Sequence, residues 1–379
     1  MKNEELILGQ GQMLSPTNKA EDILPKNEIE SRIERLHGQT FYRGNSYFPE
    51  QNSKAYEERQ MDLERHIKLF GYPDFNYLLY GMDVKSQEEQ DKYVNAWEFI
   101  CRRNFLNMHR NIHNSTCILR NKFYFGIFAS AIGIKTPLNV AYIENRVISD
   151  IANGFKAVSL TETLGKSPDV FCKSMDGENG VGVFHVQYKD GIIIINGKQA
   201  DETDFWNVIG NGTFLIQEKI TQHPEMSRIY PTSINTLRID TVRNLKNGEI
   251  HLWPSMMRMG AFGSHIDNGS QGGIMVNIDL ETGVLNDYGY RESHFDGGGI
   301  FYEHPNTKVK FNSFEVPFFK EAVEKCVFFH SMLKDIHSIG WDVVITPDGP
   351  AFIEGNDDWE ILDAQLGGGV RNLYERDFF

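Results

Sequence analysis

The sequence predicts an α+β protein, and three observations along the chain support this fold class. Across residues 53–112, apolar residues recur every three to four positions, which is the spacing of one helix face. After Pro137, apolar runs of strand length are separated by glycine and Asn–Gly turns, as in antiparallel or mixed sheets. Residues 314–338 return to a helical pattern, and residues 341–356 then predict a strand, a turn and a second strand.

The N-terminal region carries helix signals but no catalytic pattern. Residues 1–30 are polar, and we expect them to form a loose or partly helical arm. Ser86 lies three residues before Glu89, which is the spacing of a capping box at the start of a helix. We expect a helix from there to bury one side formed by Tyr93, Trp97, Ile100 and Cys101. A further helix is predicted over residues 120–134.

Length and composition limit the class of protein. A chain of 379 residues is expected to form two or three lobes. Its net charge of −14 disfavours general binding to nucleic acid, because phosphate backbones attract basic proteins. The four cysteines are scattered and form no CxxC pair, which favours a reducing cytoplasm over a disulfide framework. No signal peptide or bilayer-spanning run is visible, so we expect no membrane insertion.

The segment WDVVITPDGPAFIEGN carries the strongest chemical signal. We expect Asp342 to start one strand, while Glu354 and Asn356 end its hairpin partner. Residues two apart on a strand point to the same face, so Glu354 and Asn356 should point together. Two carboxylates and one amide oxygen suit Mg²⁺, which prefers oxygen ligands. The alternative is a solvated hairpin with ordinary surface acids.

Two further segments suggest nucleotide contacts. Lys173 precedes a glycine-rich loop that contains Gly177, Gly180 and Gly182, and glycines let backbone N–H groups approach phosphate oxygens. A plain hairpin turn explains the same glycines. In QEKI, the backbone at Gln217 to Ile220 could pair with an adenine edge, although an ordinary junction between strand and loop fits as well.

The segment INTLRIDTVR places Asn235 three residues before Arg238, which shares a strand face with Asp240. Arginine suits bidentate contact with phosphate or carboxylate, and a salt bridge between strands is the alternative. Arg258, in RMGAFGSHIDNG, could hold a second carboxylate or a phosphate. The polar loop that follows it, with His265, Asp267 and Asn268, is a candidate lining of a substrate pocket.

In their order along the chain, these segments resemble the ATP-grasp superfamily, and most closely its sugar-transfer-associated branch. The resemblance covers roughly residues 115–370, and its most specific parts are IGWDVVITPDGPAFIEGN and SINTLRIDTVRN. It implies two α+β lobes that grip ATP. We therefore expect a small lobe with the phosphate loop over 113–225 and a large lobe with the Mg²⁺ site over 226–379. The N-terminal arm and helical region, 1–112, lies outside the part that the superfamily shares.

The resemblance also implies roles for individual residues. It assigns catalytic roles to Lys173, Arg238 and Arg258. These residues would neutralise charge at the transferred phosphate or bind the substrate. Contacts to the ATP cofactor fall to Lys122, Lys173, Gly177, Gly180, Gly182, Gln217, Glu218, Ile220, Glu225 and Asn235. The ligands of Mg²⁺ are Asp342, Glu354 and Asn356. Two positions depart from the family pattern: Lys173 is followed by serine instead of proline, and Asn356 is followed by Asp357–Asp358–Trp359, beside the expected substrate pocket.

The implied function is an ATP- and Mg²⁺-dependent ligase that joins a small-molecule carboxylate to an amine through an acyl phosphate. The resulting amide or peptide bond would belong to cell-surface polysaccharide or related small-molecule biosynthesis. A kinase of the same fold and a non-catalytic nucleotide-binding assembly protein are the alternatives. Residues 1–110 could cap the acceptor site, mediate formation of a homodimer or dock a partner enzyme.

Overall fold

The computed structural model describes Leu14 and residues 18–39, 43–109, 115–175, 182–292, 295 and 297–379. Two compact units are defined by the contacts within them. The large unit consists of Met1–Thr116, Pro224–Val343 and Gly355–Phe379. The small unit consists of Cys117–His223 and Val344–Glu354. The N-terminal helical region therefore belongs to the same unit as the large sheet.

The N-terminal part of the large unit is helical, as the sequence predicts. Its elements are α1 (Ala20–Ile23), α2 (Lys26–His37), α3 (Tyr56–Phe70), η3 (Met82–Val84), α4 (Gln87–Gln90), α5 (Ala96–Asn104) and η4 (Phe105–His109). Helix α3 ends at Gly71, whose left-handed φ of 85° lets its N–H bond to the Ile67 carbonyl. The capping box of Ser86 and Glu89 is present at the start of α4.

The prediction of one long helix after Ser86 is wrong. Helix α4 stops at Gln90, and a second helix, α5, begins at Ala96 because the Asn95 side chain accepts a hydrogen bond from the Trp97 N–H. The break changes which side chains are buried. Tyr93 is buried in the turn, while α5 buries Ala96 and Phe99 in place of the predicted face at Trp97, Ile100 and Cys101.

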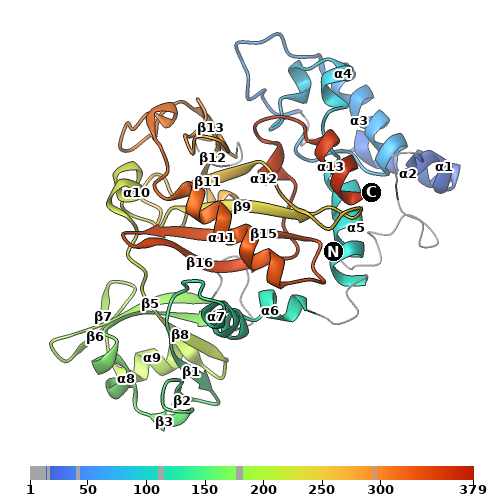
Figure 1. Cartoon of the computed structure of the whole chain (residues 1–379). Coiled ribbons are helices and arrows are strands. Elements are labelled where there is room, and N and C mark those ends of the chain that lie inside the picture. Colours follow the sequence, from blue (N-terminus) through green and yellow to red (C-terminus); the bar gives the residue numbers. More distant parts are fainter. Residues whose placement is uncertain are drawn as a thin grey trace. The chain divides into compact units, whose positions relative to one another are not determined.

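The large sheet has the strand order β14-β13-β12-β11-β9-β15-β16, and β10 pairs with β9 (Figure 1). Its strands are β9 (Thr236–Arg243), β10 (Ile250–Leu252), β11 (Ser255–Met259), β12 (Ile274–Ile278), β13 (Gly289–Arg291), β14 (Gly299–Phe301), β15 (Ser338–Thr346) and β16 (Gly349–Asn356). The helices around it are α10 (Pro224–Ile229), η5 (Gly269–Gln271), η6 (Phe311–Ser313), α11 (Phe319–Met332), α12 (Leu362–Gln365) and α13 (Arg371–Phe378). The predicted hairpin turn at Asn247–Gly248 joins β9 to β10, and Gly248 has the expected positive φ of 76°.

The two faces of the large sheet are covered by different elements. Helix α11 crosses one face, where Phe329 stacks on Trp341 of β15 at 4.7 Å between ring centroids (Figure 1). The opposite face carries Met256, Met275 and Tyr290, which share one apolar cluster with residues of α1, α2 and α3. The N-terminal helices thus pack on this second face, which we call the helix-covered face.

The small unit is built on a second sheet, with the order β3-β2-β1-β8-β4-β5-β6-β7. Its strands are β1 (Asn139–Glu144), β2 (Val147–Asp150), β3 (Lys156–Val158), β4 (Asp169–Ser174), β5 (Val183–Lys189), β6 (Ile192–Ile195), β7 (Lys198–Ala200) and β8 (Phe214–Glu218). Its helices are α7 (Lys122–Ala131), α8 (Leu160–Lys166) and α9 (Glu202–Ile209), and α6 (Thr116–Arg120) precedes them. The antiparallel pairing agrees with the predicted sheet type.

One face of the small sheet forms the core of its unit. Val170 and Cys172 of β4 pack there with Leu164 of α8 and Phe205 of α9. Because side chains alternate along a strand, Phe171 and Lys173 lie on the other face. Helices α8 and α9 therefore cover the face of this sheet that is opposite Lys173.

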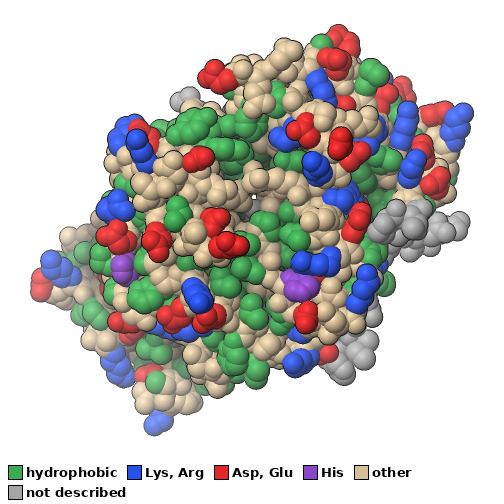
Figure 2. All heavy atoms as spheres, turned by 45° about the horizontal axis from the view of Figure 1, so that its top comes forward, with side chains coloured by type: hydrophobic (Ala, Val, Ile, Leu, Met, Phe, Trp, Pro, Cys, Tyr) green, Lys and Arg blue, Asp and Glu red, His purple; other side chains and the backbone are tan. Residues whose placement is uncertain are grey.

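The surface carries charges of both signs. On the face shown in Figure 2, basic and acidic side chains are interspersed, and hydrophobic side chains form patches between them. Among the described residues, no helix combines the length and apolar character that crossing a bilayer requires.

Candidate functional site

A buried carboxylate held by two arginines lies on the helix-covered face of the large sheet. Arg238 of β9 donates from Nε to Oδ1 of Asp342 at 2.7 Å, and Arg258 of β11 donates from Nη2 to Oδ2 at 2.8 Å. All three residues are buried, with at most 9% of their surface exposed. Two guanidinium charges thus face one carboxylate in a setting that water screens poorly.

The two arginines set the ionisation of Asp342. Burial alone would raise the pKa of this carboxyl, but the charges of Arg238 and Arg258 hold the pKa well below its ordinary value. Asp342 in turn raises the pKa of Arg258 above its ordinary value, against the opposing effect of burial. The ion pairs of Asp342 with Arg238 and Arg258 therefore hold this carboxyl in its ionised form at neutral pH.

A hydroxyl group extends this cluster to a second acid. The Thr236 Oγ1 atom accepts from Nε and Nη2 of Arg258 at 3.1 and 2.9 Å, and it donates to Oδ2 of Asp267 at 2.6 Å. The backbone N–H of Thr236 also donates to that oxygen at 2.9 Å. Burial raises the pKa of Asp267, although Arg258 opposes the change.

The polar loop that the sequence singled out is thus connected to the arginine cluster through Asp267. His265 instead lies at the surface, where its Nδ1 is 3.2 Å from the Thr232 carbonyl, and Asn268 caps η5. Sequence reasoning did not include Thr236 among the functional residues. A signal was available, because Thr236 is two residues before Arg238 and therefore shares its strand face.

Lys122 and Glu354 each lie within electrostatic range of Lys173 in the small unit. Burial lowers the pKa of Lys173, Glu354 opposes this, and Lys122 lowers the pKa further. Lys122 is the first residue of α7, behind Asn121, whose side chain caps the helix. Three predicted site residues that are distant in sequence are therefore brought together.

The glycine-rich loop is described only at its end. Gly177 and Gly180 lie outside the described residues. Gly182 has a left-handed φ of 74°, and a Cβ atom built on it would lie 2.7 Å from the Ser174 Cβ. The Ser174 N–H donates to the Gly182 carbonyl at 2.9 Å, so this glycine closes the β4–β5 hairpin beside Lys173. The geometry requires glycine at this position, whatever the loop binds.

The predicted adenine hinge lies at the end of β8. Gln217 is paired with Phe171 across the sheet and shares the face of Lys173, where its Nε2 donates to Oδ1 of Asn139 at 2.8 Å. The Glu218 side chain is on the opposite face and accepts from the Ser167 hydroxyl at 3.0 Å. Among the described residues, none accepts a hydrogen bond from the Ile220 N–H, so this donor is available to a ligand.

Two other predicted nucleotide contacts have partners within the large unit. Glu225, in the first turn of α10, accepts from Nε of Arg228 at 2.7 Å. Asn235 is fully buried, and its amide nitrogen donates to the carbonyls of Met226 and Tyr230 at 2.8 Å each. The side chain of Asn235 therefore fixes the end of α10 against the start of β9.

The three predicted metal ligands lie on the last two strands. Asp342 does not start β15 as predicted, because residues from Ser338 onward already form the buried strand. Glu354 and Asn356 are two apart near the end of β16 and so point to the same side. Among the described residues, no group of three or more His, Cys, Asp or Glu side chains could hold a metal.

Comparison with known proteins identifies the family to which the chain belongs. Residues 102–376 match the sugar-transfer associated ATP-grasp family. The match covers more than half of the chain, so the protein is a member of that family and has the ATP-grasp fold. No curated protein matches the chain.

Several solved structures are similar to parts of the chain. An N5-carboxyaminoimidazole ribonucleotide synthetase from Thermotoga maritima is 15% identical with a TM-score of 0.34, over 64% of this chain and 43% of that one. A D-alanine–D-alanine ligase from Bacillus anthracis, complexed with ATP, is 12% identical with a TM-score of 0.38, over 69% and 67%. D-alanyl-alanine synthetase A from Vibrio cholerae is 12% identical with a TM-score of 0.37, over 69% and 61%.

Proposed function

We propose that the protein is an ATP- and Mg²⁺-dependent ligase that joins a carboxylate to an amine through an acyl phosphate. Membership of the ATP-grasp family supports the use of ATP. The observation that carries the proposal is the buried cluster in which Arg238 and Arg258 share Asp342. Guanidinium groups are suited to phosphate and carboxylate oxygens, which makes these two arginines candidates to bind an anionic group of the substrate.

The donor set on the last two strands fits a magnesium ion. Asp342 is held ionised, which is the state that metal binding requires, and each of its oxygens has a second lone pair beyond the arginine contact. Asp342, Glu354 and Asn356 would hold the ion, and all three offer hard oxygen atoms. When bound, Mg²⁺ would supply charge neutralisation at the phosphate oxygens of ATP.

The cationic side chains have separate tasks in the proposed reaction. Lys173 and Lys122 bind the phosphates of ATP, and the backbone N–H of Ile220 binds the adenine. Arg238 offsets the charge on the transferred γ-phosphoryl group, while Arg258 holds the substrate carboxylate. Such fixed groups accelerate phosphoryl transfer mainly by positioning and charge stabilisation, because the protein forms no covalent bond in this step.

The proposed chemistry has two steps. A carboxylate oxygen attacks the γ-phosphorus, the bond from that phosphorus to the β–γ bridging oxygen breaks, and ADP leaves. The amine nitrogen then attacks the acyl carbon, the carbon–oxygen bond to phosphate breaks, and inorganic phosphate leaves as the amine loses a proton. The association of the family with sugar transfer supports a substrate that contains or is joined to a sugar. We propose that this substrate belongs to cell-surface polysaccharide or related small-molecule biosynthesis, and that the protein works in the cytoplasm, where ATP is supplied.

Release of ADP tests this proposal. The purified protein, ATP and Mg²⁺ are incubated with a panel of sugar acids and amino acids, each with and without amines. We expect ADP to form with a matched acid and amine, together with inorganic phosphate and an amide product.

The same assay separates the ligase from its nearest alternative. A stable phosphorylated product that forms without any amine would identify a kinase of the same fold and would overturn the ligation step. The use of ATP would be overturned by two results together. No ADP would be released with any member of the panel, and the wild type would bind nucleotide no more tightly than Arg238→Ala does.

A further inference from the structure

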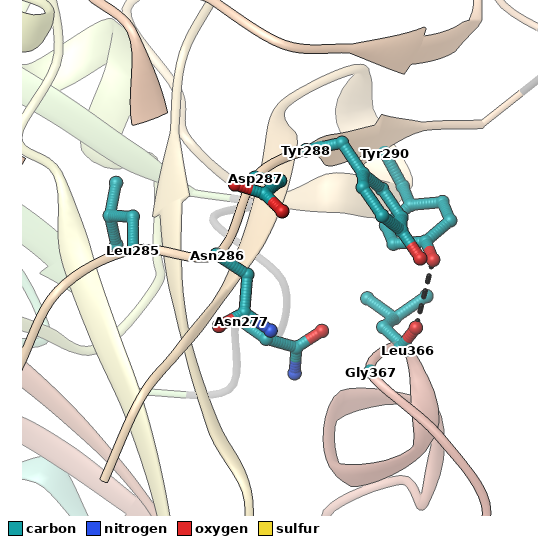
Figure 3. A pocket seen from close by; sticks show the side chains of 8 residues that line it. All are labelled: Asn277, Leu285, Asn286, Asp287, Tyr288, Tyr290, Leu366 and Gly367. Carbon is teal, nitrogen blue, oxygen red and sulfur yellow. Dashed lines mark hydrogen bonds between the residues drawn. The ribbon is translucent and has the colours of Figure 1, made fainter. Parts of the chain in front are cut away.

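A polar pocket lies in the large unit, on its helix-covered face, and is lined by other residues than the arginine cluster. The pocket has a volume of about 280 Å³ and lies between β12, β13 and the segment after α12 (Figure 3). Eight residues line it: Asn277, Leu285, Asn286, Asp287, Tyr288, Tyr290, Leu366 and Gly367. None of the roles assigned above to nucleotide or metal binding involves these residues.

The strand register relates this pocket to the arginine cluster. Arg238 of β9 is paired with Met256 of β11, and Met256 is paired with Asn277 of β12. Directly paired residues share a face, so these three side chains form one row across the sheet. Adjacent strands are about 4.8 Å apart, which places Asn277 roughly 10 Å from Arg238 along this row.

The pocket wall offers hydrogen bonds without positive charge. The side-chain amides of Asn277 and Asn286 can each donate and accept, and the Asp287 carboxylate accepts. None of the eight described residues that line the pocket is lysine, arginine or histidine. A phosphate or carboxylate would meet no balancing cation here, whereas a neutral group with several hydroxyls would find both donors and acceptors.

Two tyrosines form the aromatic side of the pocket. The Tyr290 hydroxyl donates to the Leu366 carbonyl at 2.9 Å, and the Tyr288 ring lies 5.4 Å from the Tyr290 ring, in a perpendicular arrangement. Figure 3 shows that both hydroxyls and the Asn277 amide point toward the loop at Leu366 and Gly367. An apolar ring face beside polar side chains suits a ligand that has both C–H faces and hydroxyl edges.

A wider hollow adjoins the pocket at Asp287, which lines both. This hollow has a volume of about 680 Å³, and Ile300, Tyr302, Lys308 and Lys310 are among its lining residues. Tyr302 is 66% exposed, and its ring is 6.1 Å from that of Tyr288. A ligand larger than one ring could therefore continue from the first pocket into the second.

We propose that the pocket at Asn277, Asn286 and Tyr288 is a subsite for one neutral sugar ring, and that the adjoining hollow accepts the next part of the same molecule. The small volume fits a single ring better than a larger cofactor, since sites for drug-sized ligands are about 300–1,000 Å³. The proposal that this pocket binds a sugar does not depend on whether the protein uses ATP. That the bound sugar belongs to the acceptor or acid substrate rests on the function proposed above.

Equilibrium binding in the absence of nucleotide tests the subsite. Glucose, galactose and N-acetylglucosamine are titrated against the full chain by ligand-observed NMR, with glucuronate as the charged comparator. We expect at least one neutral sugar to bind with Kd on the order of 1 mM, and glucuronate to bind more weakly. Asn286→Ala and Tyr288→Ala should each weaken the binding of the neutral sugar about tenfold.

Phe328→Ala provides the matched control, because this half-exposed aromatic side chain is on α11, across the sheet from the pocket. It should keep wild-type affinity, and circular dichroism should confirm that all variants are folded. The subsite is refuted if no neutral sugar binds, if both pocket variants bind as the wild type does, or if glucuronate binds best. Because no ATP is present, these outcomes are separate from failure of the ADP assay.

Discussion

Asp342 illustrates how single residues set the chemistry of this protein. A buried carboxylate is costly unless it is paired, and Asp342 is paired with two arginines on two neighbouring strands. The sequence predicted the side chains involved, because Arg238 and Asp342 belong to the most specific motifs. It could not predict that they form one ion cluster, since that depends on which strands become neighbours.

Lys173 allows a direct test at this scale. Lys173→Met keeps a long side chain but removes the charge that we assign to the ATP phosphates. We expect affinity for a non-hydrolysable ATP analogue to fall roughly 10–100-fold, because one or two hydrogen bonds between charged groups would be lost. Lys189→Met, at the exposed end of β5, should bind as the wild type does. Equal affinities in both variants would remove Lys173 from the nucleotide site.

Thr236 was missed by sequence reasoning, because a threonine in a strand is usually interpreted as a strand former. Its hydroxyl joins Arg258 to Asp267, so Thr236→Val should leave two buried charged groups with one partner fewer. We expect the free energy of unfolding to fall by about 1–3 kcal/mol in urea titrations. Thr236→Ser keeps the hydroxyl and should restore most of the stability; a valine variant as stable as the wild type would argue against this bridge.

At the scale of elements, capping and turn residues predicted where helices begin and where the chain turns, but they did not predict how long each helix is. The capping box at Ser86 is where it was expected, but the helix that it opens is short because Asn95 starts a new one. An Asn–Ala–Trp sequence is compatible with both a helix interior and a cap, so the pattern alone did not separate the two helices. The strand–turn–strand prediction over 341–356 was correct, apart from the earlier start of β15.

The β4–β5 hairpin provides a prediction about one element. Gly182→Ala would place an alanine at a positive φ and would bring its Cβ to 2.7 Å from the Ser174 Cβ. Gly191→Ala, in the next turn, has a φ of 82° but no atom within 4 Å of the added Cβ. Both variants should lose about 1 kcal/mol for the left-handed conformation, and Gly182→Ala should lose more because of the contact. Urea unfolding that ranks the two variants equally would show that the hairpin adjusts freely.

At the scale of the whole molecule, the family resemblance predicted the fold class, and the apolar periodicity of residues 53–112 predicted the helical N-terminal region. It did not predict what those helices pack against, because an amphipathic pattern identifies an apolar face but not its partner. The structure groups them with the large sheet, through residues such as Met256 and Tyr290. Of the roles left open for residues 1–110, a cover on the substrate side of this sheet is the one that we now favour.

Buried histidines of the large unit predict how stability depends on pH. Burial lowers the pKa of His66 and His337 to about 4 and that of His330 to about 3. The unfolded chain therefore binds more protons, and stability should fall as pH drops from about 6.5 toward 4. Burial raises the pKa of Asp74 to about 6, which acts in the opposite direction over part of this range.

His66→Phe tests this dependence, since the ring contacts of His66 with Phe70 and Tyr77 can be kept by phenylalanine. Between pH 7.5 and pH 5, the wild type should lose roughly 2 kcal/mol through His66 alone, and the variant should be spared that loss. The measurement is the urea midpoint at both pH values. A variant with the same pH dependence as the wild type would show that His66 does not titrate as described.

Magnesium-dependent nucleotide binding tests the central claim most directly, because it needs no knowledge of the other substrates. Calorimetric titration of a non-hydrolysable ATP analogue is carried out with and without Mg²⁺ on the wild type, Glu354→Gln and Glu281→Gln, an exposed glutamate in the turn after β12. We predict that Mg²⁺ tightens binding at least about tenfold in the wild type and in Glu281→Gln, and that this gain is lost in Glu354→Gln. An equal gain in all three proteins, or no nucleotide binding by the wild type, would contradict the assignment of an ATP and metal site to these residues.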